Sequence, residues 1–243
     1  MTRILTYNVH RCVGVDRRLD VARVAAVIAE HEPDIVALQE VDVFRARTGG
    51  VDQAHRIAER LNMAFRFNAA LRVEEEQYGD AILTRLPEHL VKAGPLPGYR
   101  RIPQLEPRGA LWVEVSIGGK ALQVINTHLG LVPREQQIQA AHVAGHEWLS
   151  CPDCVAPAIL VGDFNATPMS VVHRRLSGHL TDARRLAPGP RRVPTFPSTF
   201  PVLAIDHVFV SAGVKVRSVR AGDSPLARVA SDHLPLIVDF DLA

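Results

Sequence analysis

Pro157-Ala158-Ile159-Leu160-Val161-Gly162-Asp163-Phe164-Asn165-Ala166 is the stretch from which the fold of this chain can be argued. It is an apolar run of strand length that ends in a glycine, a carboxylate and, two positions later, a carboxamide. A strand that is apolar on both faces is buried on both sides, so its polar end is the first point at which it meets water. We therefore expect Asp163 and Asn165 to lie at the rim of a sheet.

Three other apolar runs end in the same way. The runs over 3–9, 34–40 and 120–127 carry Asn8, Glu40 and His128 at their ends. Packing alone does not explain four buried strands that all finish on a side chain able to bind a ligand. Because open α/β sheets bind ligands at the C-terminal ends of their strands, we predict one shared site there.

The composition is that of an ordinary globular protein. The chain has 243 residues, of which 47% are hydrophobic, and we expect one domain over residues 1–243. No window is apolar for long enough to span a bilayer, and the N-terminus enters a strand directly, so we expect a cytoplasmic protein without a transmembrane segment. The formal charge of +2 neither supports nor excludes a nucleic-acid partner.

Cys151 and Cys154 have the spacing of a redox motif or of half a zinc site. No second such pair and no adjacent pair of histidines accompanies them, which favours an inert loop pair over a redox or metal role.

The periodicity of apolar residues predicts the remaining elements. Helices are expected over 20–31, 49–62, 133–150 and 168–176, and strands over 3–9, 34–40, 64–68, 79–84, 109–117, 120–127, 157–163, 205–210, 214–220 and 234–240. The helix over 133–150 would bury the side that carries Ile138, Ala141, Gly145 and Trp148. Residues 87–107 are expected to be loop with at most one short strand, and residues 187–201 a long irregular connection.

The strand ends repeat in the two halves of the chain. A strand ending in Asn8, a helix and a strand ending in Glu40 are matched by a strand ending in His128, a helix and a strand ending in Asp163. This repeat predicts an α/β protein with two sheets packed face to face and helices outside them.

Two acidic residues precede histidines near the C-terminus, Asp206-His207 and Asp232-His233. With the strand ends they complete a set of candidate site residues: Asn8, Glu40, His128, Asp163, Asn165, Asp206, Asp232 and His233. This set is dominated by oxygen ligands, which suit magnesium, manganese or calcium better than zinc.

The ordered motifs of the chain resemble those of the endonuclease/exonuclease/phosphatase superfamily. They are Thr6-Tyr7-Asn8-Val9-His10, Leu38-Gln39-Glu40-Val41, Tyr78-Gly79-Asp80-Ala81-Ile82-Leu83, Asn126-Thr127-His128-Leu129, Gly162-Asp163-Phe164-Asn165, Ile205-Asp206-His207 and Ser231-Asp232-His233-Leu234-Pro235. The resemblance implies a four-layered α/β/β/α sandwich with two packed mixed β-sheets, and metal-dependent hydrolysis of a phosphoester.

The resemblance also implies roles for single residues. Glu40 would be the principal ligand of Mg2+ (or Mn2+), with Asn8 beside it and Asp232 contacting the metal through water.

The remaining implied roles belong to the reaction itself. Asp163 would orient and deprotonate the attacking water, and Asn165 would hold that water or a phosphate oxygen. His128 and His233 would contact phosphoryl oxygens, while Asp206 would fix the tautomer of His233.

Contacts to the rest of the substrate are expected from loops. Arg108 is a candidate phosphate contact or a structural ion pair, and His10 and Arg11 are candidates for the rim of the site. Phe196 and Phe200, with Arg192 in the same proline-rich loop, form a candidate substrate wall; the alternative is a solvated connection.

Asp80 departs from the resemblance. Many relatives read Tyr-Gly-Asn where this chain has Tyr78-Gly79-Asp80. Because a carboxylate repels phosphate, either Asp80 pairs with Arg108 or a histidine, or the phosphate is placed differently.

Three functions are compatible with these residues. The first is a metal-dependent phosphodiesterase that acts on a small or lipid-derived phosphoester. The second is a DNA endonuclease or exonuclease, and the third is a non-catalytic binding protein on the same fold. Since the complete set of eight residues is present, we rank the binding protein last.

Overall fold

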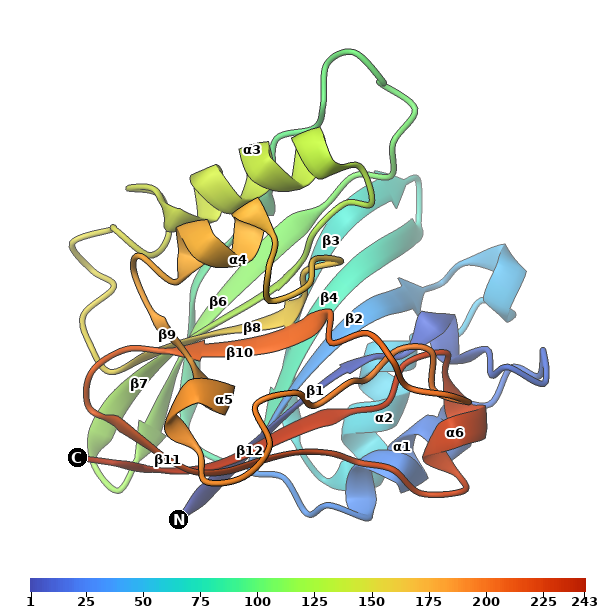
Figure 1. Cartoon of the computed structure of the whole chain (residues 1–243). Coiled ribbons are helices and arrows are strands. Elements are labelled where there is room, and N and C mark those ends of the chain that lie inside the picture. Colours follow the sequence, from blue (N-terminus) through green and yellow to red (C-terminus); the bar gives the residue numbers. More distant parts are fainter.

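The computed structural model describes residues 1–243 and contains two six-stranded mixed sheets packed face to face (Figure 1). The first sheet consists, in spatial order, of β11 (Val214–Ala221), β12 (Leu236–Leu242), β1 (Thr2–Asn8), β2 (Ile35–Val43), β4 (Glu76–Thr84) and β3 (Ala64–Val73). The second consists of β5 (Glu88–Pro95), β6 (Gly109–Ile117), β7 (Lys120–His128), β8 (Ala158–Asp163), β10 (Asp206–Val210) and β9 (Thr181–Asp182).

Helices cover the outer faces of both sheets. Helices α1 (Val21–Ala29), α2 (Gln53–Leu61) and α6 (Ala227–Ala230) lie against the first sheet, and α3 (Pro133–Ala144) and α4 (Val171–Leu176) lie against the second (Figure 1). The short helix α5 (Ala183–Leu186) contacts β10 and β11. Two 3-10 turns, η1 (His10–Cys12) and η2 (Ala46–Thr48), follow β1 and β2. The result is the predicted four-layered α/β/β/α sandwich.

Three separate apolar layers hold the sandwich together, one between the sheets and one under each set of helices. Strand β8 shows how one strand serves two of them. Ile159 and Val161 belong to the layer between the sheets, whereas Leu160 belongs to the layer beneath α3 and α4. Since successive side chains of a strand point to opposite faces, β8 must be apolar at every position, as its sequence is.

The two strand-helix-strand halves place the polar strand ends together. Strands β1 and β2 are parallel, and so are β7 and β8, so the C-terminal ends of each pair lie at the same edge of their sheet. Within the second sheet His128 is the parallel partner of Asp163, and Asp206 on β10 is its antiparallel partner. Three of the predicted site residues are therefore neighbours in register.

Strands β3 and β4 are longer than predicted. Together they form a hairpin over 64–84 that pairs from Ala64↔Thr84 to Val73↔Glu76. Glu74, with φ of 54°, lies in the tight turn at its tip.

The loop expected over 87–107 begins with the full eight-residue strand β5, so the prediction of one short strand at most is wrong. Strand β5 is an edge strand that pairs only with β6, and most of its residues are exposed or half-buried. An edge strand with mixed polarity carries neither strict alternation nor a continuous apolar run, which is why the sequence pattern missed it.

Helix α3 ends earlier than predicted and buries a different side. It stops at Ala144 because Gly145 adopts an extended conformation, and turns fill residues 145–150. Ile138 is exposed, whereas Gln139 and Val143 are buried. The Oε1 of Gln139 accepts a hydrogen bond from the backbone N–H of Gly130. The buried polar side chain thus provides a hydrogen-bond partner for the backbone of the loop after β7.

The segments between β8 and β10 agree with the prediction only in part. Helix α4 begins at Val171 rather than at Pro168, because the Ser170 side chain accepts a hydrogen bond from His173 N and caps the helix. Strand β9 and helix α5 were not predicted. Residues 187–201 are irregular as expected, apart from an isolated bridge between Phe196 and Leu203.

The cysteines are free thiols. Burial raises the pKa of the Cys154 thiol to about 11, which keeps it protonated and a poor nucleophile near neutral pH. Among the helices, not one has the length and apolar character that crossing a bilayer requires.

Candidate active site

A cavity of about 520 Å³ opens where the strand ends of the two sheets meet. Eleven of the predicted residues line it: Asn8, His10, Arg11, Glu40, Arg108, His128, Asp163, Asn165, Phe196, Asp232 and His233. Asp206 does not line the cavity but is fully buried and bonded to His233. The structure therefore brings the eight predicted site residues of the strand ends and C-terminal pairs into one place.

Asn8 joins the two carboxylates that face each other across the sheets. Its Nδ2 donates to Glu40 Oε1 at 3.1 Å and to Asp163 Oδ2 at 3.0 Å. Its Oδ1 accepts a hydrogen bond from the His10 backbone N–H, which fixes the amide orientation. Glu40 has φ of 58° at an irregularity in the β2–β4 pairing, and that conformation departs from the strand pattern on either side of it.

Asp163 is almost completely buried and surrounded by nitrogen atoms. Its Oδ2 lies 3.5 Å from Nε2 of His128 and 3.6 Å from Nε2 of His233. Burial and repulsion from Asp206 raise the pKa of Asp163 to about 7, although His233 and the hydrogen bond from Asn8 oppose the rise. The carboxylate is thus poised to gain or lose a proton near neutral pH.

His233 is held by Asp206. Its Nδ1 lies 2.9 Å from Asp206 Oδ2 and donates to it, which leaves Nε2 directed toward Asp163. Burial alone would lower the pKa of His233, but attraction to Asp206 and Asp163 outweighs burial and raises it to about 10. Thr195 donates its hydroxyl proton to the same Asp206 oxygen. His233 therefore carries a positive charge at neutral pH.

His128 is neutral by contrast. Burial, together with the positive charges of Arg108 and His233, holds its pKa well below the usual range. Arg108 Nη1 lies 2.9 Å from His128 Nδ1, while Nε2 faces both Asp163 Oδ2 at 3.5 Å and the Asn165 amide nitrogen at 3.1 Å. The two histidines next to Asp163 differ in charge because one is backed by a carboxylate and the other by a guanidinium.

Asn165 is fixed in a turn directly after β8. Its backbone has φ of 48°, and its N–H donates to Asp163 Oδ1 at 2.8 Å. Its side-chain Nδ2 donates to the Leu129 carbonyl at 3.0 Å and lies 3.1 Å from His128 Nε2. The side chain therefore borders the same space as Asp163.

Arg108 and Asp80 show how the loop before β6 enters the site. Arg108 is 6% exposed, bonds to Tyr78 Oη at 3.3 Å and forms its ion pair with Glu106 at 3.0 Å, not with Asp80. Asp80 is buried, and burial together with repulsion from Glu40 raises its pKa well above the usual range, while Arg108 opposes the rise. Burial thus favours the neutral form of Asp80, which weakens the repulsion expected between its carboxylate and a phosphate.

The predicted substrate wall is only partly correct. Phe196 lines the cavity, with its ring centroid 4.9 Å from that of His233. Arg192 is exposed and lies outside the cavity lining, since its guanidinium donates to the Val202 carbonyl, and Phe200 is 74% exposed and also outside. The predictions for Arg192 and Phe200 are therefore wrong: the loop folds back on itself through Phe196 and Leu203 and turns these side chains to solvent.

Three residues of the cavity, Glu106, Leu131 and Leu203, were not singled out from the sequence. Glu106 contacts Arg108, as does Tyr78 of the Tyr78-Gly79-Asp80 motif, and its proximity to Arg108 in the chain was a usable signal. Leu131 and Leu203 gave no signal, because they lie in loops without periodicity.

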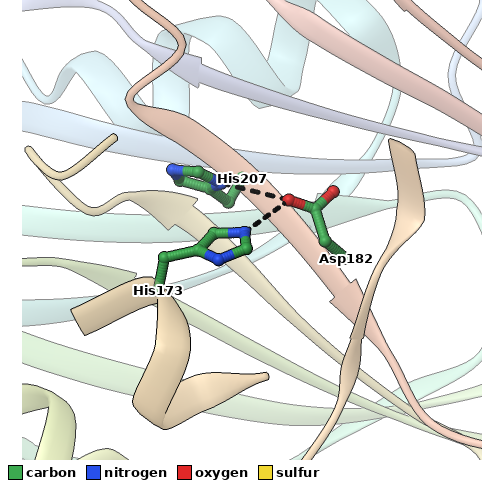
Figure 2. A group of neighbouring side chains, drawn as sticks. All are labelled: His173, Asp182 and His207. Atoms are coloured by element: carbon green, nitrogen blue, oxygen red, sulfur yellow. Dashed lines mark hydrogen bonds and ion pairs between the residues drawn. The ribbon is translucent and has the colours of Figure 1, made fainter. Parts of the chain in front are cut away.

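A second cluster of titratable side chains consists of His173, Asp182 and His207 (Figure 2). His173 Nε2 donates to Asp182 Oδ2 at 2.7 Å, and His207 Nδ1 lies 3.5 Å from the same oxygen. The group has the composition of a metal site, but the guanidinium of Arg184 donates both to Asp182 and to His207 Nδ1. Because a fixed cation already occupies the atoms that a metal would need, the cluster is structural. His207 Nε2 donates to the Ala166 carbonyl at 2.7 Å and so anchors the turn that carries Asn165.

The donor set on the open side of Asp163 fits a hard divalent cation. Glu40, Asp163 and Asp232 offer carboxylate oxygens to the cavity, and Asn8 donates hydrogen bonds to the first two. Oxygen ligands of this kind are those that Mg2+ and Mn2+ prefer.

A four-layered α/β sandwich with carboxylates, imidazoles and an arginine gathered at one end of its strands defines a class of proteins that are generally hydrolases. Residues 5–233 match the Endonuclease/Exonuclease/phosphatase family, and the chain belongs to it. This confirms the resemblance seen in the sequence motifs.

Three similar proteins illustrate the relationship. The uncharacterized protein YbhP of Escherichia coli K12 is 29% identical over 255 residues, which cover 99% of this chain and 96% of YbhP. The crystal structure of an endonuclease/exonuclease/phosphatase from Beutenbergia cavernae DSM 12333 has a TM-score of 0.80 and 27% identity, and covers 100% of this chain and 72% of that one. The mannosyl-6-phosphatase Bt3783 of Bacteroides thetaiotaomicron has a TM-score of 0.76 and 20% identity, with 100% of both chains covered.

Proposed function

We propose that this protein is a divalent-metal-dependent phosphoester hydrolase that acts on a small or lipid-derived phosphodiester. The observation that carries the proposal is the position of Asp163, whose Oδ2 lies 3.0 Å from Asn8, 3.5 Å from His128 and 3.6 Å from His233 at the floor of an open cavity. A carboxylate held this firmly can align a water molecule and accept its proton.

The residues around Asp163 supply the rest of the reaction. In-line attack on phosphorus builds negative charge on the phosphoryl oxygens, which the charged His233 can stabilise and His128 can contact. Arg108 holds the His128 ring through Nδ1, and Asn165 would border the attacking water. Every group is already bonded in place, so little reorganisation is needed during reaction.

The metal would be held around Glu40. Glu40 would be the principal ligand of Mg2+ or Mn2+, with Asn8 beside it and Asp232 as an outer ligand through water. When bound, the cation would polarise a phosphoryl oxygen and neutralise charge on the leaving oxygen. The cluster of Asp163, Asp206 and His233 is a poorer metal site, because His233 already compensates both carboxylates.

The small substrate is supported by the apolar residues of the cavity. Phe196, Leu131 and Leu203 suit the organic part of a small ester or a lipid headgroup. The formal charge of +2 neither supports nor excludes DNA, which is therefore included in the substrate panel.

The test is hydrolysis of a substrate panel by purified protein in EDTA, Mg2+ and Mn2+. The panel contains bis-p-nitrophenyl phosphate, p-nitrophenyl phosphate, sphingomyelin, plasmid DNA and a duplex with an abasic site. An Asp163→Asn variant, prepared in parallel, exposes contaminating enzymes.

Metal-dependent cleavage of the small diester or the lipid, absent in Asp163→Asn, is the expected result. Cleavage confined to DNA, weakening steeply as salt rises, would replace the proposal with the nuclease alternative. Cleavage of p-nitrophenyl phosphate alone would make the protein a monoester phosphatase. No metal-dependent activity on any substrate would contradict the proposal.

A further inference from the structure

The turn after β1 is strained and faces the cavity. His10, Arg11 and Cys12 have φ of 46°, 56° and 58°, a left-handed conformation that residues other than glycine rarely adopt. Glu40 and Asn165, with φ of 58° and 48°, border the same cavity. Backbone strain of this kind persists only where the surrounding structure fixes it, and it is typical of ligand-binding segments.

One buried side chain fixes the turn. Gln53 on α2 is completely buried, and its Nε2 donates to the Arg11 carbonyl at 2.7 Å. Its Oε1 accepts from the backbone N–H of Asp42 at 3.0 Å, two residues after Glu40. Gln53 thus ties the strained turn to the strand that carries Glu40. The backbone N–H of Cys12 also donates to the Val9 carbonyl at 2.8 Å.

The Arg11 side chain is a cation without an acidic partner. It lines the cavity, and its Nη2 lies 2.7 Å from Nε2 of His10. Since Nδ1 of His10 donates to the Val13 carbonyl at 2.9 Å, Nε2 of the neutral ring accepts the bond from Arg11. By contrast, Arg108 is paired with Glu106 and Arg47 with Asp42. The Nε of Arg11 is buried and has no hydrogen-bond partner.

Arg11 is also separate from the groups that surround Asp163. It makes no hydrogen bond or ion pair with Asp163, His128 or His233, and reaches them only through His10, whose backbone N–H donates to Asn8. A guanidinium is the side chain best suited to bind phosphate or carboxylate, because its N–H groups match both geometrically. We therefore expect an anionic group to bind the unpaired guanidinium of Arg11 in the cavity.

We propose that Arg11, presented by the strained turn at His10–Cys12, forms a subsite for a second anionic group of the substrate. The inference rests on the proposed function and narrows it: the substrate is a phosphoester that carries a further phosphate or carboxylate beyond the phosphoryl group at Asp163. Gln53 holds the turn in the conformation that presents Arg11.

The test is equilibrium binding by titration calorimetry in Mg2+, with two matched pairs of probes. Thymidine 5′-monophosphate is compared with thymidine 3′,5′-bisphosphate, and fructose 6-phosphate with fructose 1,6-bisphosphate. Because these ligands need not turn over, the result does not depend on hydrolysis. We expect the wild type to bind at least one bisphosphate about tenfold or more tightly than its monophosphate, as a charge-assisted bond implies.

Three variants test whether Arg11 causes the difference in affinity between the bisphosphate and the monophosphate. Arg11→Ala should abolish the preference for the bisphosphate and leave monophosphate affinity within about twofold, while Arg11→Lys should retain part of it. Arg17→Ala, which alters an exposed arginine of the same loop, should behave as the wild type.

Two results would overturn the inference. One is equal affinity of the wild type for both members of both pairs. The other is an equal loss of monophosphate and bisphosphate affinity in Arg11→Ala, which would place Arg11 on the reacting phosphate. A third result separates the two proposals. If the preference for the bisphosphate depends on Arg11 but no substrate of the panel is hydrolysed, the anion subsite is supported and the proposed hydrolase activity is contradicted.

Discussion

Acid should destabilise the protein through His207, and the size of the effect can be worked out from the structure. Burial, together with the charge of Arg184, lowers the pKa of His207 to about 4, while the hydrogen bond to Asp182 opposes the shift. An unfolded histidine titrates near 6.5. Between these values the unfolded chain binds a proton that the folded protein does not, so the free energy of unfolding falls as the pH falls.

The magnitude follows from the two pKa values. For a folded pKa of about 4 and an unfolded pKa of about 6.5, acidification from pH 7 to pH 4.5 removes about 2 to 3 kcal/mol through His207. His128 titrates in the same direction, because its pKa is also lowered. Only a comparison with a His207 variant therefore isolates the contribution of His207.

The assay is urea unfolding at pH 7 and pH 4.5 for the wild type and His207→Gln. Glutamine keeps a donor toward the Ala166 carbonyl but cannot titrate, so the variant should lose about 2 to 3 kcal/mol less on acidification. His146→Gln, at an exposed histidine, serves as the control and should match the wild type. Equal acid sensitivity of His207→Gln and the wild type would refute the reasoning, because His207 would then titrate normally when folded.

Three further outcomes are expected. Gln53→Ala removes both hydrogen bonds of a buried amide and should lower the free energy of unfolding by about 1 to 3 kcal/mol in urea titrations; no loss would contradict the assigned contacts. Phe196→Ala should lower kcat/KM on the best substrate, whereas Arg192→Ala, outside the cavity, should not; the reverse pattern would refute the described loop. Gly162→Ala should unfold at a Tm at least several degrees lower, because a Cβ there would lie 1.8 Å from the Thr127 carbonyl oxygen; an unchanged Tm would contradict this approach.

The convergence of the strand ends could be predicted because it follows from local patterns. Parallel pairing of β1 with β2 and of β7 with β8 is encoded by two strand-helix-strand units with buried strands. Once the strands are parallel, Asn8, Glu40, His128 and Asp163 must lie at corresponding edges. The sequence also placed Phe196 correctly, although not its neighbour Arg192.

The errors have a common cause, which is that polar burial and edge pairing are decided by distant contacts. Gln139 is buried because it bonds to the loop after His128, so helix α3 buries a side that its apolar pattern does not indicate. The contacts among His173, Asp182 and His207 depend on the packing of α4, β9 and β10, and no single segment signals them. The raised pKa of Asp80 likewise follows from burial in the folded protein.

The most direct test of the central claim is the turnover of Glu40→Gln and Asp163→Asn in Mg2+, measured on the best substrate of the panel. Both substitutions keep the size of the side chain and remove its charge, so folding can be verified by an unchanged circular dichroism spectrum. If Glu40 holds the metal and Asp163 activates water, each variant should lose about two orders of magnitude or more in kcat. Turnover within a few-fold of the wild type in either variant would contradict the assignment of the site.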